Sequence, residues 1–317
     1  ISAEFRHEPV CAWIERGRVT STDSVPGMLA EWFWKKLEDI RFLRDGVYDN
    51  TARGYAAWRQ LFKETGITLD SAQYRFPDIS SDPDCDAQWT VVNKGPLIQT
   101  TWGQGCTFNN LCPSMGCVNP QCNAPNAWTG CIATAMAQVV RFWQPVTVYQ
   151  YDYGSMPLAF GNSEVQRLMR DIGRPESVDM DYQCHGSFAD GSRIPGALVG
   201  RFGFSSAHRG PYASSSYLSV LQNLDSGWPV ILAGCASRQR VWLFFWKYSN
   251  CHEWICDGYR ELRNPCFSYL WMHMNWGWHE VNGPTDFNGW YLFNNWNIPG
   301  VQRNYRYATE LTHNIHL

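Results

Sequence analysis

The stretch "TGCIATAMAQVVRFWQP", from Thr129 to Pro145, decides how the rest of the chain is interpreted. Its apolar residues recur at three- and four-residue steps, as on one face of an α-helix; they are Ile132, Met136, Val139, Val140 and Trp143. Thr129 is a suitable N-cap, and Pro145 prevents the helix from continuing past Gln144. The stretch therefore predicts a helix whose first turn carries a cysteine, Cys131.

The position of Cys131 fits two interpretations, a reactive nucleophile and a structural cysteine. Unpaired amide N–H groups and the positive end of the helix dipole stabilise anions at a helix N-terminus. A thiol in such a setting is pushed toward the thiolate, with pKa values of roughly 3.5–7.5, and becomes a nucleophile. A small buried apolar residue, or one half of a disulfide, fits the same stretch, so the stretch alone leaves both interpretations open.

Composition excludes several classes of protein. The chain has 317 residues, of which 44% are hydrophobic and 15% aromatic, as in a globular protein. No apolar run approaches the roughly 18 residues that a membrane helix needs. The net charge is −3 and Lys and Arg do not cluster, which argues against a nucleic-acid partner.

Charge density divides the chain into two parts. Residues 1–88 contain 26 of its 55 charged residues and show two helical apolar stripes, which end at Gly46 and Gly66. The following stretch, "YRFPDISSDPDCDAQW" (74–89), reads as a loop rich in proline and aspartate. We therefore expect a helical N-terminal segment at 1–88 and a second domain at 89–317.

The second domain has the pattern of an α+β fold. A further short helix is expected at 163–172, "SEVQRLMRDI". Later segments are short, rich in aromatic and β-branched residues and separated by Gly, Asn and Pro, as in an antiparallel sheet; they are "WPVILAG", "VWLFFWKY", "HEWICDGY", "YLWMHMNW" and "GWYLFN". Helices followed by strands predict the α+β class.

Four of the twelve cysteines fall close together, at positions 106, 112, 117 and 122. Their spacing lacks the Cys-x-x-Cys pairs of a structural zinc site, so we expect no metal. Disulfides in a loop of an exported protein are the better interpretation, with the connectivity left open.

A cysteine nucleophile needs a base, usually histidine, and a group that orients the imidazole. Among eight histidines, His252 stands out because it opens the apolar strand "CHEWICDGY". Asn275, in "MHMNWGWHEVNG", has an amide oxygen that can accept from a histidine ring, and Trp276 can shield that bond from water. The alternatives for His252 are a structural histidine and a metal ligand acting with Cys251 and Cys256. The alternative for Asn275 and Trp276 is a strand end that buries two indoles.

Taken together, four segments resemble the streptopain family of papain-clan cysteine peptidases, over roughly residues 96–292. They are "PLIQTTWGQGCTFNNLCP", the helix "TGCIATAMAQVVRFWQP", "WPVILAG" with "CHEWICDGY", and "NWGW" followed by "NGWY". The resemblance implies a papain-like fold, in which a helical subdomain carries the nucleophile helix beside an antiparallel sheet subdomain. It also implies hydrolysis of peptide bonds in polypeptide substrates without a cofactor, in a protein exported by a bacterium.

The resemblance also implies roles for individual residues. Cys131 corresponds to the nucleophile and His252 to the base. Asn275 would orient the imidazole, with Trp276 over it. Gln104 would donate to the oxyanion from its side-chain amide, together with the backbone N–H of Cys131.

Three departures from the family pattern bear on substrate preference. Cys251 stands where the family usually has a glycine past which the substrate backbone runs, so it is expected to lie at that edge and crowd it. Glu253 replaces a small residue after the histidine. His279 and Glu280 replace a pair of glycines in a rim loop.

The N-terminal segment has two interpretations. Zymogens of the family carry a prosegment that blocks the catalytic domain, and "DSVPGMLAEWFWKKLEDI" resembles the late part of that prosegment. The alternative is a helical layer that stays attached. The same Cys–His–Asn chemistry also serves transglutaminase-like acyltransferases, and a silent binding module could keep the fold, so these remain rival functions.

Overall fold

The computed structural model describes residues 90–118, 122, 124–213, 216–242, 245–264, 267–279, 287–293, 296, 298, 301 and 303–317. The chain divides into two units, one of residues 1–92 with 261–269, the other of residues 93–260 with 270–317. The helices expected before residue 89, and the expected boundary at residue 88, lie outside the described residues. The candidate site lies entirely within the second unit.

The described helices are α3 (Cys131–Trp143), α4 (Ser163–Ile172), α5 (Ile194–Phe202) and α6 (Ser216–Asp225), with short 3-10 turns η3 (Tyr153–Ser155) and η4 (Gly191–Arg193). The strands are β1 (Thr90–Lys94), β2 (Ser206–Pro211), β3 (Val230–Trp242), β4 (Phe245–Asn264), β5 (Phe267–Asn275), β6 (Gly289–Leu292) and β7 (Tyr307–His316). The α3 and α4 helices confirm the two helices expected in this domain. The segment "VWLFFWKY" is not one strand, since it holds the end of β3 and the start of β4, which pair antiparallel up to Trp242 and Phe245.

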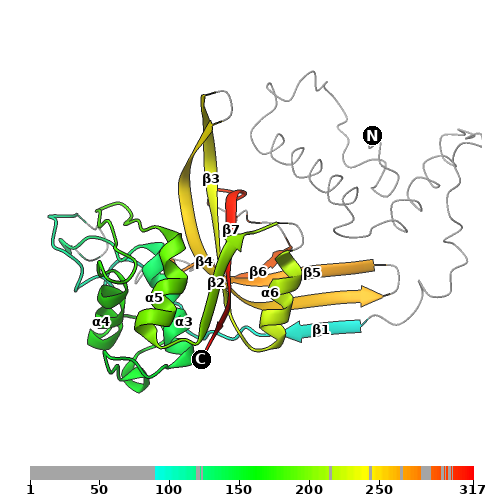
Figure 1. Cartoon of the computed structure of the whole chain (residues 1–317), viewed down its shortest axis with the longest axis horizontal. Coiled ribbons are helices and arrows are strands. Elements are labelled where there is room, and N and C mark those ends of the chain that lie inside the picture. The colour runs from blue at the N-terminus through cyan, green and yellow to red at the C-terminus, as the bar shows by residue number, and fades with distance from the viewer. Residues whose placement is uncertain are drawn as a thin grey trace, which may run out of the picture. The chain divides into compact units, whose positions relative to one another are not determined.

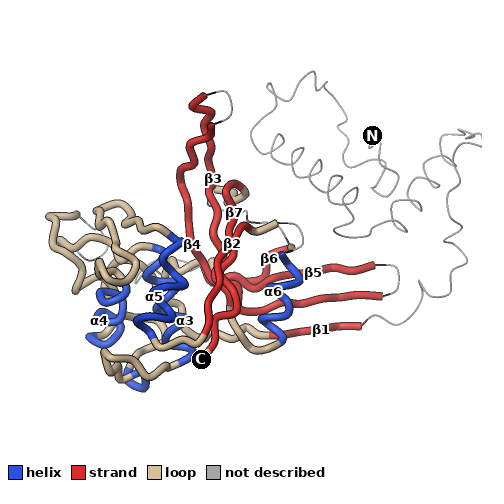
Figure 2. Tube along the Cα trace, viewed as in Figure 1, coloured by secondary structure: helices blue, strands red, loops and turns tan. Residues whose placement is uncertain are grey.

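The strands form one sheet in the order β2-β7-β3-β4-β5-β6, and β1 pairs with β4. The pairs β2–β7, β7–β3, β3–β4 and β5–β6 are antiparallel. Figure 1 shows α3, α4 and α5 grouped on one side of the strands β2, β7, β3 and β4, with α6 on the other side. The separation of helices from strands is also plain in Figure 2, and it confirms the α+β class.

The helix α3 lies at the centre of the helical part. Every residue from Ile132 to Val140 is buried, so the helix is enclosed and not buried on one face alone as its apolar spacing predicts. Small side chains allow this close packing, and the two polar ones inside the helix are hydrogen-bonded: Thr134 donates to the Gly103 carbonyl and Gln138 accepts from Thr100. Tertiary packing and not the helix sequence alone therefore determines its buried surface.

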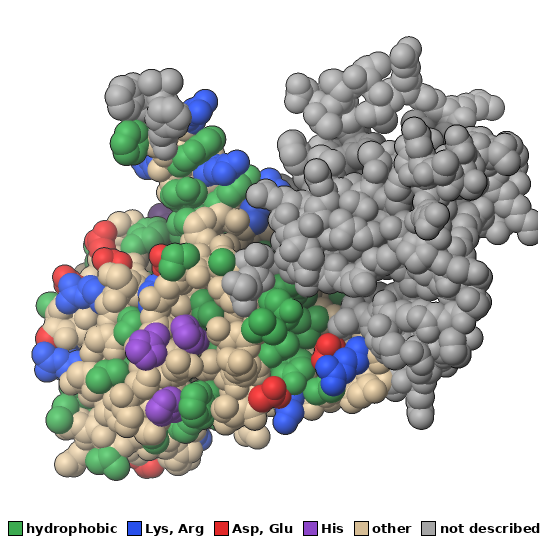
Figure 3. Space-filling model, turned by 45° about the vertical axis from the view of Figure 1, so that its right-hand side comes forward, with side chains coloured by type: hydrophobic (Ala, Val, Ile, Leu, Met, Phe, Trp, Pro, Cys, Tyr) green, Lys and Arg blue, Asp and Glu red, His purple; other side chains and the backbone are tan. Residues whose placement is uncertain are grey.

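Away from the helices, β3 and β4 continue as a projecting hairpin whose far end carries apolar and cationic side chains (Figure 3). The guanidinium of Arg238 lies 4.5 Å from the Trp246 ring centre and that of Arg240 lies 5.7 Å from it. Cation–π contacts between paired strands therefore support this part of the hairpin, where Trp246 and Tyr248 are exposed.

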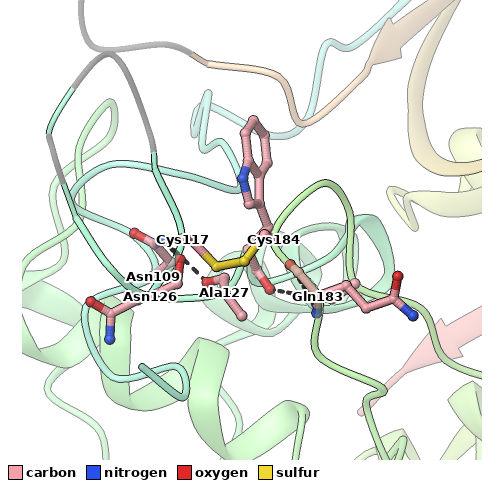
Figure 4. Close-up of a disulfide and its surroundings, with 8 residues drawn as sticks. Asn109, Cys117, Asn126, Ala127, Gln183 and Cys184 are labelled. Atoms are coloured by element: carbon pink, nitrogen blue, oxygen red, sulfur yellow. Dashed lines mark hydrogen bonds between the residues drawn. A yellow bond between two sulfur atoms is a disulfide. The ribbon is translucent and has the colours of Figure 1, made fainter. Parts of the chain in front are cut away.

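Within the described residues three disulfides are formed, which confirms the disulfide expectation for part of the first cysteine group; they are Cys106–Cys122, Cys117–Cys184 and Cys235–Cys251. Cys112 of that group is a buried free thiol. Figure 4 shows the Cys117–Cys184 bond, which joins the loop before α3 to the loop after α4. Beside it, Gln183 accepts a hydrogen bond from the Trp128 backbone at 3.2 Å, so this disulfide fixes the segment that leads into Cys131.

We expect removal of Cys117–Cys184 to destabilise the protein more than removal of Cys106–Cys122. The first closes a sequence separation of 67 residues and the second one of 16. Loop-closure entropy then predicts losses of about 4 and about 3 kcal/mol in the free energy of unfolding. Urea titration of the two double serine variants measures both, and an equal or larger loss for the shorter loop would contradict the loop-entropy account.

Candidate active site

Cys131 is the first residue of α3, as the sequence predicts, but the helix is capped differently from the expectation. The residue before it, Gly130, has φ +86°, and a Cβ added there would lie 2.9 Å from the Ser187 carbonyl oxygen. Only glycine fits both the backbone conformation and the space. Thr129 is not the N-cap, because its hydroxyl instead donates to the Gln104 carbonyl at 3.3 Å.

The surroundings of Cys131 hold its sulfur as a thiol. Burial raises the pKa of Cys131 to about 12, and the Glu253 carboxylate adds to the rise. Backbone N–H groups of Glu253, Ile132 and Cys131 itself donate to the sulfur and lower the pKa, but by less. The expected lowering at the helix N-terminus is therefore present and is outweighed by desolvation.

The Trp-Gly-Gln loop lies beside the start of α3. Trp102 is fully buried, and a Cβ added to Gly103 would collide with the backbone of His279, so the loop is closely packed on both sides. Gln104 is buried, and its carbonyl accepts from the Thr129 backbone N–H at 3.0 Å. The Gln104 backbone thus contacts Thr129, which stands two residues before Cys131 in the chain, and the oxyanion role of the Gln104 side chain stays a prediction.

His252 is buried in a cage of aromatic rings. Its ring centre lies 4.7 Å from that of Trp278 and 5.4 Å from that of Tyr305, and its Nε2 is 2.8 Å from the Trp276 carbonyl oxygen. Burial lowers the pKa of His252 to about 4; the Trp276 carbonyl opposes this and the charge of Arg303 adds to it. Because a carbonyl only accepts, Nε2 donates and Nδ1 of the neutral ring keeps a lone pair for a proton.

Over the ranges that the structure describes, no hydrogen bond joins Asn275 to His252, although its amide was expected to orient the ring. Its Nδ2 donates to the Thr100 carbonyl at 2.7 Å and to Gln138 Oε1 at 3.2 Å, and its Oδ1 accepts from Gln138 Nε2 at 3.3 Å. The partner of the imidazole is the backbone of the next residue, Trp276. Through its bonds to Gln138, Asn275 ties the end of β5 to α3.

The expected nucleophile meets the strand that carries the expected base. Glu253 shares a face of β4 with Ile255, which packs in the core around α3, whereas His252 shares the other face with Trp254. Cys131 contacts the strand at the backbone of Glu253, the residue next to His252. Among the described residues, no hydrogen bond joins Cys131 to His252.

Cys251 precedes His252 and is exposed, but its sulfur is bonded to Cys235 on the neighbouring strand. The two residues are directly opposite in the β3–β4 register. The side chain that was expected to crowd a substrate edge is therefore drawn toward β3. The disulfide fixes the backbone immediately before the histidine.

Two residues near His252, Tyr305 and Arg303, are not indicated by any local pattern in the sequence. Tyr305 is 1% exposed, and its backbone lies so close to β3 that a Cβ on Gly234 would collide with it. Arg303 donates to the Tyr305 hydroxyl; burial raises the pKa of Tyr305, and a charge on Cys131 would add to that rise. Both are over 50 residues from His252 in the chain, so no local spacing points to them.

In the part of the chain that the structure describes, no group of three or more His, Cys, Asp or Glu side chains is placed to hold a metal ion. The chemistry that the described residues support is that of a thiol, an imidazole and backbone donors.

The chain resembles proteins that are named as cysteine peptidases. It is 24% identical over 243 residues to streptopain of Streptococcus pyogenes, an alignment that covers 61% of this chain and 56% of streptopain. The chain therefore spans little more than half the length of that relative.

Solved structures show the same fold. The structure of active interpain A, a cysteine protease of Prevotella intermedia, matches with a TM-score of 0.54 at 20% identity, covering 79% of this chain and all of that one. A prointerpain A fragment matches with a TM-score of 0.51 at 20% identity, covering 82% of this chain and 80% of that one. These likenesses confirm the papain-like α+β fold.

The model of the Peptidase C10 family matches residues 102–291, a range that contains Gln104, Cys131, His252 and Asn275. This range is well over half of the chain and coincides with the part in which the four sequence segments resemble streptopain. The chain belongs to the Peptidase C10 family.

Proposed function

We propose that this protein is a cysteine endopeptidase in which Cys131 is the nucleophile and His252 the general base. The observation that carries the proposal is the meeting of α3 with β4. The thiol at the helix N-terminus accepts from the backbone of the residue beside a buried, neutral imidazole. Family membership and the printed names of streptopain and interpain A support the reaction class.

The reaction follows from these groups. His252 Nδ1 takes the proton of Cys131 as the sulfur attacks the peptide carbonyl carbon. The resulting oxyanion is stabilised by the backbone N–H of Cys131 and by the side-chain amide of Gln104. His252 then gives its proton to the leaving amine, and water, deprotonated by the same imidazole, hydrolyses the acyl-enzyme. In the absence of substrate, hydrogen bonds between such groups are often long and shorten when the substrate binds.

A backbone carbonyl orients the imidazole in this mechanism. The Trp276 carbonyl fixes Nε2 as the donor, so Nδ1 is the atom that exchanges protons. Asn275 acts at a distance, because it links β5 to Gln138 of α3 and so holds the two halves of the site together. Trp276 is fully buried, and its indole stacks on the His252 ring at 6.2 Å, which excludes water from the Nε2 hydrogen bond.

Export is part of the same proposal. Disulfides persist in oxidising compartments, and three are formed among the described residues. None of the helices in the described part of the chain combines the length and the apolar character of a membrane span. Secretion to the cell surface or beyond accounts for the disulfides.

Incubation with a denatured protein tests the function. Mass spectrometry should find new internal peptide ends with the wild-type chain and none with Cys131→Ala. An added primary amine separates peptidase from acyltransferase activity, because an acyltransferase would attach the amine to the acyl fragment. A chain that does not react with a cysteine-directed alkylator, and neither cleaves nor transfers, would support the binding module instead.

We further propose that residues 1–88 act as a prosegment that inhibits the intact chain. Their charge density differs from that of the remainder, and the loop-like 74–89 stretch suits proteolysis. A solved prointerpain A fragment, whose name indicates a precursor, supports a precursor form in related folds.

Cleavage between residues 84 and 95 is therefore expected to raise the rate of peptide hydrolysis at least about tenfold, if the segment covers the cleft with an affinity typical of a docked domain. Added residues 1–88 should inhibit the cleaved enzyme in trans. The measurement is the rate on a fluorogenic peptide before and after cleavage. Equal rates would favour a helical layer that does not regulate activity.

A further inference from the structure

A buried cluster of charges lies on the face of the sheet that carries α3. The Arg209 guanidinium donates to Glu253 Oε1 at 2.6 Å, to Glu310 Oε2 at 2.7 Å and to the Thr312 hydroxyl at 2.9 Å. The side chains of Arg209 and Glu253 are each 8% exposed, whereas that of Glu310 is 46% exposed. The Arg209 guanidinium thus pairs with two carboxylates, and only the Glu253 carboxylate is shielded from solvent.

The register of the sheet explains how this cluster forms. Ala233 of β3 pairs with Glu253 on one side and with Glu310 of β7 on the other, so the two carboxylates flank a methyl group. Arg209 of β2 pairs with Thr312 of β7. The small side chain of Ala233 leaves room for the guanidinium to reach from β2 across β7 and β3 to Glu253.

The loop over this cluster also packs against the start of α3. A Cβ added to Gly191 would collide with the Arg209 guanidinium and lie 2.9 Å from Glu253 Oε1. Four residues earlier, the Ser187 carbonyl contacts Gly130, the residue before Cys131. The same short loop therefore spans from the charge cluster to the nucleophile helix, and the backbone N–H of Glu253 donates to the Cys131 sulfur.

We propose that Glu253 is a positioning residue that controls the nucleophile: its carboxylate, held in place by Arg209, opposes formation of the Cys131 thiolate and sets the pH at which Cys131 reacts. This inference rests on the proposed role of Cys131. It gives a function to the position at which the chain departs from the small residue of the streptopain pattern.

The pKa shifts of Glu253 and Cys131 have the direction that this proposal requires. Burial and the nearby Glu310 raise the pKa of Glu253 to about 7, against the lowering effect of Arg209, and the Glu253 charge contributes to the raised pKa of Cys131. Hydrogen bonds from Ser192 lower the pKa of Asp190, and the charge of Arg209 adds a smaller lowering effect. A charged Glu253 disfavours the Cys131 thiolate, and the thiolate disfavours a charged Glu253. The thiolate therefore forms most readily when Glu253 is protonated. Removing the Glu253 charge must therefore lower the pKa of Cys131.

The test is the pH profile of Cys131 alkylation by iodoacetamide in the full chain, followed by mass spectrometry of the Cys131 peptide. Glu253→Gln should move the midpoint down by about one pH unit, which raises the alkylation rate about tenfold at pH values above about 7, where wild-type Glu253 is charged, and below both midpoints. Glu310→Gln is the matched control, because it removes the same charge from the same guanidinium but lies toward solvent. It should leave the midpoint within about 0.3 units. An unmoved midpoint in Glu253→Gln, or equal shifts in both variants, would overturn the proposal.

A second variant guards against loss of folding. Arg209→Met combined with Glu253→Leu removes both ends of the buried pair, a replacement that proteins often tolerate. The midpoint should again move down, and an upward or absent shift would count against Glu253. The outcome is separable from that of the proposed function. If Cys131→Ala still cleaves protein, the peptidase assignment fails whatever the alkylation profiles do. If Cys131→Ala is inactive and the profiles do not move, only the present inference fails.

Discussion

Cys131→Ala is expected to abolish peptide hydrolysis while leaving the protein folded. Losing the nucleophile of a nucleophile–base pair typically lowers kcat on the order of 10⁶-fold. The fold should survive because alanine is a good helix former and because the described partners of the sulfur are backbone N–H groups. The measurement is kcat on a fluorogenic peptide, together with thermal unfolding followed by circular dichroism.

Cys112→Ala is the matched control for that experiment. Cys112 is a free thiol like Cys131 but is buried rather than half-buried, and burial raises its pKa to about 12 as well, while its side-chain partner is Tyr182. We expect this variant to keep full activity. Turnover in Cys131→Ala at the wild-type rate, or an equal loss in both variants, would contradict the assignment of the nucleophile.

His252→Ala is expected to lose nearly as much activity as Cys131→Ala, and the double variant no more than either single one. The two residues act on one proton and one bond, so their losses do not add. The measurement is kcat/KM for the three variants. In the wild type, the pKa of His252 is lowered to about 4, so the neutral base is present above that pH. The acid limb of kcat/KM should therefore lie well below the ordinary histidine value of about 6.5.

Asn275→Ala serves as the comparison for His252. Because the ring is held by the Trp276 carbonyl and not by Asn275, the variant should keep the position of the acid limb. It should lower stability by roughly 1–3 kcal/mol, since Gln138 and the Thr100 carbonyl lose a buried partner. A loss of activity larger than that of His252→Ala at full stability would show that Asn275 acts directly on the chemistry.

Much of the fold can be predicted from local sequence. Regular apolar spacing, with Pro145 beyond the end, sets the extent of α3, and clusters of β-branched and aromatic residues separated by Gly and Asn mark the strands. Cys131 at a helix start and His252 at the head of an apolar strand are likewise visible, because each needs only its neighbours in the chain. The family resemblance rests on these local segments.

Three features depended on tertiary structure. The Trp276 carbonyl takes the place expected of Asn275 beside His252, because the segment after β5 brings that carbonyl to the ring while the Asn275 amide is bound to Gln138 and Thr100. The pKa of Cys131 rises where the helix dipole alone would lower it, since enclosure of α3 removes solvent and brings in the Glu253 charge. Arg209 meets Glu253 through the β2-β7-β3-β4 order, across 44 residues of sequence. Local sequence determined which groups are present, whereas strand pairing and burial decided which of them meet and which carry charge.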